Sequence, residues 1–227
     1  MKIKFGSIVV DARNKIGGHV ASKNRFGSYI RTKVTPTNPR TSYQIQSRAR
    51  LASLSSGFRS LTQSQIKAWN DAARLFQKTD VFGDLKTNTG LQLYVGLNYN
   101  LLLTGQSTIN TPPMPKQTAV VYVQTLSILK TPNTVRLTLS DDVPAGTIMV
   151  VAATPALSAA KNFVRSELRI IGTYDATTSS PVNIYSEYAD KYGELGAVGQ
   201  KIFVEVWFID IATGIPSGKQ QISALIA

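Results

Sequence analysis

The sequence contains no cysteine and only one histidine, His19. Without cysteine the chain can form no disulfide, no thiolate-ligated zinc or iron–sulfur centre and no thiol nucleophile. One imidazole cannot build a site with several histidine ligands, and the neighbours of His19 are Gly17, Gly18 and basic residues rather than carboxylates that could orient its ring. We therefore interpret His19 as a surface residue in a glycine-rich turn, and we expect no metal site and no cofactor.

Long apolar runs are missing as well. No stretch approaches the roughly 20 apolar residues that cross a bilayer, so we expect no membrane span. The first residues carry only a short apolar run, without the length of the apolar region of a secretory leader. We therefore expect a chain made in a cytoplasm.

Patterns that carry catalysis are absent too. The sequence contains neither the phosphate-binding pattern G-x-x-x-x-G-K-[ST] nor the nucleophile pattern G-x-S-x-G. Glu167 and Glu187 could serve as the two carboxylates of a glycosidase, but nothing in their spacing marks them as a pair. We predict that the protein is not an enzyme, has no catalytic residue and takes no small-molecule substrate.

Acidic residues are scarce in the first third of the chain. The whole sequence has 25 Lys and Arg against 13 Asp and Glu, a net charge of +12, and all of that excess lies within residues 1–86. No acid stands between Asp11 and Asp71, so the bases of that segment face solvent, an anion or another chain. Basic side chains on a common surface can neutralise phosphates without reading base sequence. We predict a nucleic-acid- or anion-binding surface made of Arg13, Lys15, Lys23, Arg25, Arg31, Lys33, Arg40, Arg48 and Arg50.

Composition divides the chain into two predicted domains, 1–110 and 117–227. Between them, residues 111–116 contain three prolines within four positions, which is typical of a stiff, extended linker. Residues 1–40 are rich in glycine, basic and β-branched residues and predict a small β-meander. Its expected strands are 7–12, 20–23 and 29–34, with turns at 14–18 and 24–27.

Residues 41–105 predict three helices. The first begins at Thr41 or Ser42 and ends near Ser56, with Gly57 just beyond its last turn. The second follows a capping box at residues 62–65, and the third runs from about residue 89 to 104. Apolar residues recur at helical spacing in the second and third helices. The structural core predicted for this part is Ile66, Trp69, Ala73, Phe76 and Leu97.

Residues 117–227 alternate between apolar and polar residues, with turn signals between the runs. About seven strands are expected there, and that number in about 110 residues is typical of an immunoglobulin-like or fibronectin type III-like sandwich. The fold class predicted for the whole chain is therefore α+β: a small meander with a helical block, followed by an all-β sandwich. The expected strands span residues 119–129, 135–139, 147–153, 168–172, 182–185, 201–210 and 220–226.

One chain of motifs is more specific than composition. Its elements are Gly27-x-Tyr29-x-Arg31-x-Lys33, Pro36-x-Asn38-Pro39-x-Thr41-x-x-Gln44, Arg48, Leu61-Thr62-x-x-Gln65, Ala68-Trp69 and Ala72-Ala73. This pattern, over roughly residues 6–105, resembles a family of poorly characterised bacteriophage and prophage proteins. In that family a basic, glycine-rich start leads into a helical hairpin, and a β domain often follows. The Leu61-Thr62-x-x-Gln65 start, with its aromatic and Ala-Ala face, also bears a fainter likeness to the second and third helices of HMG boxes.

The phage resemblance implies a non-enzymatic structural component of a virion, associated with the capsid, the connector or the tail. It implies other virion proteins as partners, homo-oligomerisation and a place in the particle. The basic N-terminal domain would then contact the genome or an acidic coat-protein surface. An alternative that the basic surface also fits is a nucleic-acid-binding architectural protein, with the β domain as a partner module.

Overall fold

The structure is a computed structural model that describes residues 1–4, 6, 11–119 and 121–227. Within these ranges it contains four helices and thirteen strands, so the chain is mixed α+β and rich in sheet. Every pairing between these strands is antiparallel. The strand predicted at 7–12 lies mostly outside the described residues.

The N-terminal sheet has the strand order β1-β4-β3-β2. Its strands are β1 (Lys2–Ile3), β2 (Asn14–Ile16), β3 (His19–Asn24) and β4 (Gly27–Thr32). The turn predicted at 14–18 is wrong in its first part, because residues 14–16 pair with β3 as a strand. The reversal needs only Gly17 and Gly18, and Gly17 has the positive φ of 55° that a side chain disfavours.

Three helices follow, and each begins at a threonine. They are α1 (Ser42–Arg59), α2 (Gln63–Ala72) and α3 (Gly90–Leu103), capped by the side chains of Thr41, Thr62 and Thr89. The capping box predicted at residues 62–65 is present, and a second one starts α3. A short hairpin of β5 (Lys78–Thr79) and β6 (Leu85–Lys86), absent from the sequence prediction, connects α2 to α3.

The prediction that α1 stops before Gly57 is wrong. The helix continues to Arg59, and the N–H of Ser60 closes it on the carbonyls of Ser56 and Gly57. A Cβ at position 57 would lie 3.2 Å from the Tyr94 hydroxyl. Gly57 therefore serves the close approach of α1 to α3 rather than a helix end.

A hydrophobic cluster joins the three helices. Of the predicted core, Trp69, Ala73 and Leu97 are buried in this cluster, and Phe76 is half-buried against it. Ile66 is only half-buried and does not belong to the cluster. The Trp69 indole meets the Tyr94 ring edge-on at 5.2 Å, and its Nε1 donates to the carbonyl of Asn110 at 2.8 Å.

The remaining strands form two sheets, of order β11-β8-β7 and β10-β9-β12-β13. Alternate residues of both sheets, such as Leu137 of β8 and Val204 of β12, share one large hydrophobic cluster. Tyr188, on α4, is buried in the same cluster. The bounds are β7 (Val123–Leu129), β8 (Thr134–Leu139), β9 (Thr147–Ala153), β10 (Arg169–Tyr174), β11 (Val182–Asn183), α4 (Tyr185–Tyr192), β12 (Lys201–Asp210) and β13 (Gln220–Leu225).

Strand β11 is shorter than predicted. It ends at Asn183, because the chain turns there into α4 rather than continuing to Tyr185. The Asn183 side chain stabilises this turn, because its Oδ1 accepts hydrogen bonds from the N–H of Tyr185 and from the N–H of Val135 on β8.

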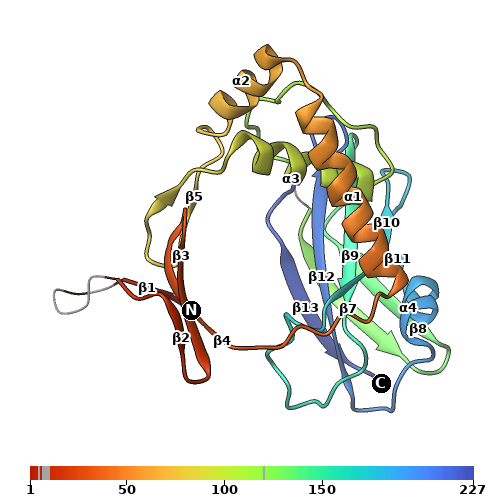
Figure 1. Cartoon of the computed structure of the whole chain (residues 1–227). Helices are drawn as coiled ribbons and strands as arrows, with labels where there is room; N and C mark the ends of the chain where they lie inside the picture. The colour runs from red at the N-terminus through yellow and green to blue at the C-terminus, as the bar shows by residue number, and fades with distance from the viewer. Residues whose placement is uncertain (5, 7–10, 120) are drawn as a thin grey trace.

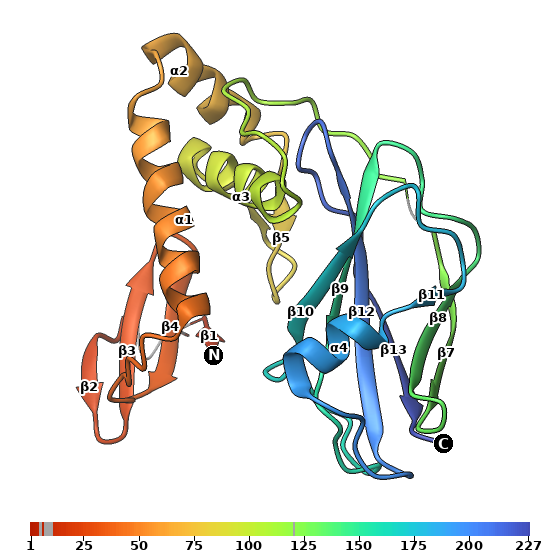
Figure 2. The same ribbon diagram turned by 90° about the vertical axis from the view of Figure 1, so that its right-hand side faces the viewer.

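The helices and the two sheets are joined by the loop between β12 and β13. Ile215 of this loop is buried in the helical cluster, and Asn100 of α3 donates to the carbonyl of Gly214 at 2.8 Å. In Figure 2, α3 lies between α1 and the two sheets, and Figure 1 shows the N-terminal sheet well apart from α1. The proline-rich segment 111–116 has no helix or strand, and Lys116 pairs with Asp210 at 2.6 Å. The predicted domain boundary is therefore crossed by packing contacts.

Candidate anion-binding surface and cleft

The N-terminal sheet is a thin layer with no core of its own. None of its described residues belongs to any of the three hydrophobic clusters of the molecule. Figures 1 and 2 both show it beside the β5–β6 hairpin and away from the large sheets, while in Figure 1 the start of α1 lies on the opposite side of the molecule, next to α4. Such a sheet is marginal by itself, so its faces are suited to contact with something outside the chain.

Two of the predicted basic residues lie on the same face of this sheet. Lys15 and Arg31 both pair with Val20, from opposite sides, so the three side chains point the same way. The two cations are thus separated by two strand spacings, about 10 Å. Lys23 differs in parity from Val20 and points to the opposite face.

The other predicted bases extend this surface along the chain. Arg25 lies in the β3–β4 turn, and Lys33 and Arg40 lie in the segment 33–41, which has no helix or strand. Arg48 is exposed on α1, whereas Arg50 is half-buried two positions further on. The nine residues therefore form a ribbon of charge over sheet, connector and helix rather than one compact patch.

Counter-charges for this ribbon are few. Arg13 pairs with Asp11 at 2.9 Å, and none of the other eight predicted bases has an ion pair within the described residues. The expectation that these bases lack acidic neighbours is therefore wrong only for Arg13, which reaches the acid at the border of the acid-free span. The remaining eight leave a strongly positive, solvent-facing surface.

Three lysines near this sheet, Lys2, Lys4 and Lys86, are paired with acids of the segment that contains β5 and β6. Asp80, in the hairpin between β5 and β6, has a buried side chain and pairs with Lys2 at 3.6 Å and Lys86 at 3.9 Å. Desolvation raises the pKa of Asp80, but hydrogen bonds from the N–H groups of Phe82 and Asp84, together with the two lysines, outweigh it and hold the pKa below its usual value. These contacts attach β1 to the β5–β6 hairpin.

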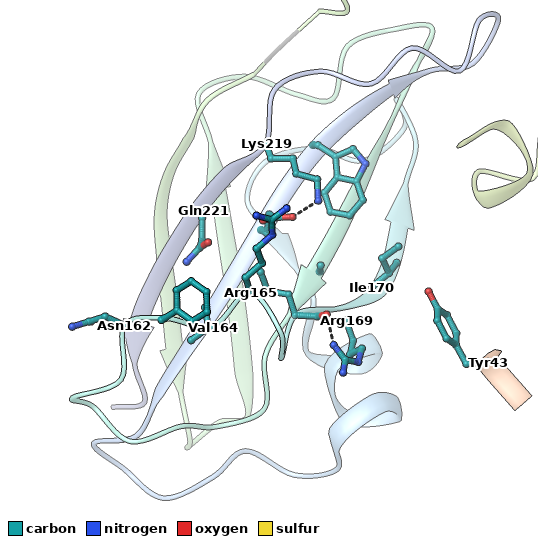
Figure 3. A pocket seen from close by; sticks show the side chains of 13 residues that line it. Tyr43, Asn162, Val164, Arg165, Arg169, Ile170, Lys219 and Gln221 are labelled. Atoms are coloured by element: carbon teal, nitrogen blue, oxygen red, sulfur yellow. Dashed lines mark hydrogen bonds and ion pairs between the residues drawn. The ribbon is translucent and has the colours of Figure 1, made fainter. Parts of the chain in front are cut away.

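A second site, which sequence reasoning missed, is a cleft of about 820 Å³ on the outer face of the sheet β10-β9-β12-β13. Trp207, Ala152 and Ile170 form its floor, and the loop between β9 and β10 supplies one wall. Figure 3 shows side chains from that loop, from the sheet and from the start of α1 converging on it. The other lining residues are Tyr43, Asn162, Phe163, Val164, Arg165, Leu168, Arg169, Glu205, Lys219 and Gln221.

The charges of this cleft are only partly paired. Lys219 forms an ion pair with Glu205 and lies 4.2 Å above the ring of Trp207. Arg169 donates from Nη1 to the carbonyls of Ser166 and Leu168, both at 2.8 Å. These bonds hold its guanidinium in place without neutralising it.

The described residues show no group of three or more potential metal ligands, and none of the helices among them is long and apolar enough to cross a membrane. The chain matches no protein-family model, no curated protein and no solved structure.

Proposed function

We propose that the protein is a non-enzymatic structural component of a bacteriophage particle, which attaches through its basic N-terminal part to the genome or to an acidic coat-protein surface. The observation that carries this proposal is the charged ribbon on a sheet without a core. The sheet is too thin to be stable alone, and its exposed positive charge suits an anionic partner. The motif chain from Gly27 to Ala73 supports the assignment to a particle.

We also propose that residues 117–227 form a fibronectin type III-like sandwich and residues 42–103 a helical block. The strand distribution supports the first, because strands one, two and five of this part share one sheet and the other four share the second. Sandwich domains commonly serve as contact modules on larger assemblies, which is an argument from fold alone.

The first experiment asks whether the chain is part of a particle. Particles are purified on a density gradient from a lysate of the host that carries the gene, and the chain is detected in the fractions with an antibody. We expect it to co-sediment with intact particles in many copies. A chain found only in the unsedimented fraction, and strictly monomeric when purified, would refute the assignment.

The second experiment asks what the ribbon contacts. The whole chain is titrated against labelled duplex DNA across a salt series, with the double variant Lys15→Glu and Arg31→Glu and with Arg136→Glu as a control on the exposed side of β8. If the genome is the partner, affinity falls steeply with salt. Loss of two phosphate contacts should reduce the slope of log K against log salt by about two. The control should keep the slope.

The same titration separates the alternative of a nucleic-acid-binding architectural protein. That reading requires DNA binding by the purified chain and no enrichment of the chain in particles. If DNA binds equally well to the double variant and to the wild type, the ribbon does not contact nucleic acid. An acidic coat protein then becomes the expected partner.

A further inference from the structure

The cleft beneath the β9–β10 loop combines features that the proposed function does not use. Its wall is held to the body of the molecule by Val164, which is buried, while the adjacent Phe163 is 79% exposed. Large exposed aromatic side chains beside arginine are typical of the anchoring points of protein interfaces. Phe163 has the lining residue Asn162 on one side and Arg165 two positions away on the other.

The electrostatics of the cleft select a negatively charged ligand. Lys219 and Glu205 cancel each other as an ion pair, which leaves the guanidinium groups of Arg165 and Arg169 as its uncompensated charges. Neither arginine has an acidic partner within the described residues. Figure 3 shows Arg165 reaching over the sheet, and Arg169 fixed to its own loop by a backbone hydrogen bond.

The same residues distinguish between classes of anion. A nucleic-acid strand carries a phosphate at every nucleotide and needs a continuous track of cations. The cleft offers only two free cations, because Glu205 cancels the charge of Lys219, and two cations do not form such a track. Two separated guanidinium forks fit one or two carboxylates, which they can bind bidentately.

The uncharged lining fits a peptide. Gln221 offers an amide donor and acceptor, and Asn162, whose Oδ1 accepts from Lys201 at 3.3 Å, offers its amide N–H groups; these can pair with peptide C=O and N–H groups. Phe163 and Tyr43 stand at the margin of the cleft and offer apolar contact area for side chains. We propose that this cleft binds an extended peptide segment of another protein, in which one or two Asp or Glu residues lie next to an apolar or aromatic side chain.

Because no natural peptide is yet identified, the test uses a display library of random 12-residue peptides, panned on the whole immobilised chain. The expected result is enrichment of sequences that place Asp or Glu beside an aromatic or aliphatic residue. Parallel panning uses the double variant Arg165→Gln and Arg169→Gln, and Arg136→Gln serves as the control on the other sheet. Enrichment on the wild type and the control, but not on the double variant, is expected.

The enriched peptide is then labelled and its affinity is measured by fluorescence anisotropy. Loss of a charge-assisted hydrogen bond from either arginine should weaken binding about tenfold or more. Arg165→Lys should recover only part of the affinity, because an ammonium group cannot form the bidentate fork. The melting temperature of each variant is compared with that of the wild type, and Arg165→Gln is the decisive single change because no hydrogen bond or ion pair of the described structure involves the Arg165 side chain.

Three outcomes would overturn the proposal: no enriched peptides, enrichment without acidic residues, or equal enrichment on the double variant. Binding of a single-stranded oligonucleotide that depends on Arg165 and Arg169 would assign the cleft to nucleic acid instead. The proposal does not rest on the attachment role of the N-terminal ribbon. The variant Lys15→Glu with Arg31→Glu should keep peptide affinity even where it abolishes binding to DNA or to particles.

Discussion

Replacing Gly214 by alanine should loosen the joint between the helices and the two large sheets. Gly214 has a φ of +70°, and a Cβ placed on it would lie 2.3 Å from the carbonyl oxygen of Leu97 on α3. Ordinary contact with such an atom begins near 3.4 Å, so the loop and the helix backbone would have to separate by about 1 Å. Neither partner is the end of a flexible side chain, and neither can give way cheaply.

The cost can be worked out from three contributions. The left-handed backbone costs a residue with a side chain about 1 kcal/mol. The hydrogen bond from Asn100 to the Gly214 carbonyl contributes about 1 kcal/mol, and partial withdrawal of Ile215 from the helical cluster loses about 1–1.5 kcal/mol of apolar burial. The expected loss in the free energy of unfolding is therefore about 3–3.5 kcal/mol.

Urea unfolding, followed by circular dichroism, measures this loss. Gly146→Ala is the matched control, because Gly146 has a φ of +75° but open space around the position of its Cβ. It should lose only the backbone contribution of about 1 kcal/mol. If the two variants were equally stable, the close approach to α3 would carry no energy, and the reasoning about the joint would fail.

Three further changes test other parts of the structure. Asn98→Leu should cost about 2–4 kcal/mol in urea unfolding, since the buried Asn98 side chain accepts from the N–H of Ile109 at 2.7 Å and donates to the carbonyl of the same residue at 3.2 Å. Thr62→Ala should cost about 1 kcal/mol through loss of the α2 capping box, measured in the same way. Burial alone would raise the pKa of Asp210, but Lys116 and hydrogen bonds within the β12–β13 loop outweigh it and hold the pKa below its usual value. Its stabilising effect is therefore complete above the unfolded pKa of about 3.9 and is lost as the pH falls through the lower folded pKa. Asp210→Asn should flatten the acid side of the profile of melting temperature against pH, and an unchanged profile would contradict this assignment.

Local signals in the sequence predicted the elements that depend on local chemistry. Thr62 and Gln65 form the capping box that their spacing predicts, and the stripe containing Trp69 and Ala73 marks the buried face of α2. The run 201–210 is strand β12, with the predicted bounds. The capping bonds lie within a few residues, and in the other two cases the local pattern of apolar residues marks the element even though its packing partners are distant.

Contacts between distant residues account for most of what the sequence did not predict. Glycine is typical of a helix end, yet Gly57 lies inside α1. Its lack of a side chain leaves room for the hydroxyl of Tyr94 on α3. Ile66 belongs to the apolar stripe of α2, but the cluster is filled by Ile215 from a loop far along the chain. The spacing of apolar residues within a helix cannot predict that a distant loop residue packs against it.

The candidate sites divide in the same way. The charge of the N-terminal ribbon is visible in composition, but its division between two sheet faces depends on the register of Lys15 and Arg31 with Val20. The cleft was missed because its residues are scattered from 43 to 221. One signal was available: Trp207 and Ile209 make the second face of β12 apolar as well, which indicates that something covers the outside of that sheet.

Because Ile215 belongs to the helical cluster and Gly214 bonds to α3, the helices cannot complete their packing until the β12–β13 loop is made. The Asn100 side chain finds its acceptor 114 residues further along the sequence. At typical synthesis rates of roughly 5–20 residues per second, the helices wait on the order of ten seconds before the residue that completes their cluster is made. During that interval the apolar faces around Trp69 and Leu97 lack one of their covering side chains. The nascent helices are therefore the stage at which this chain is most open to capture by a chaperone or by a neighbouring copy.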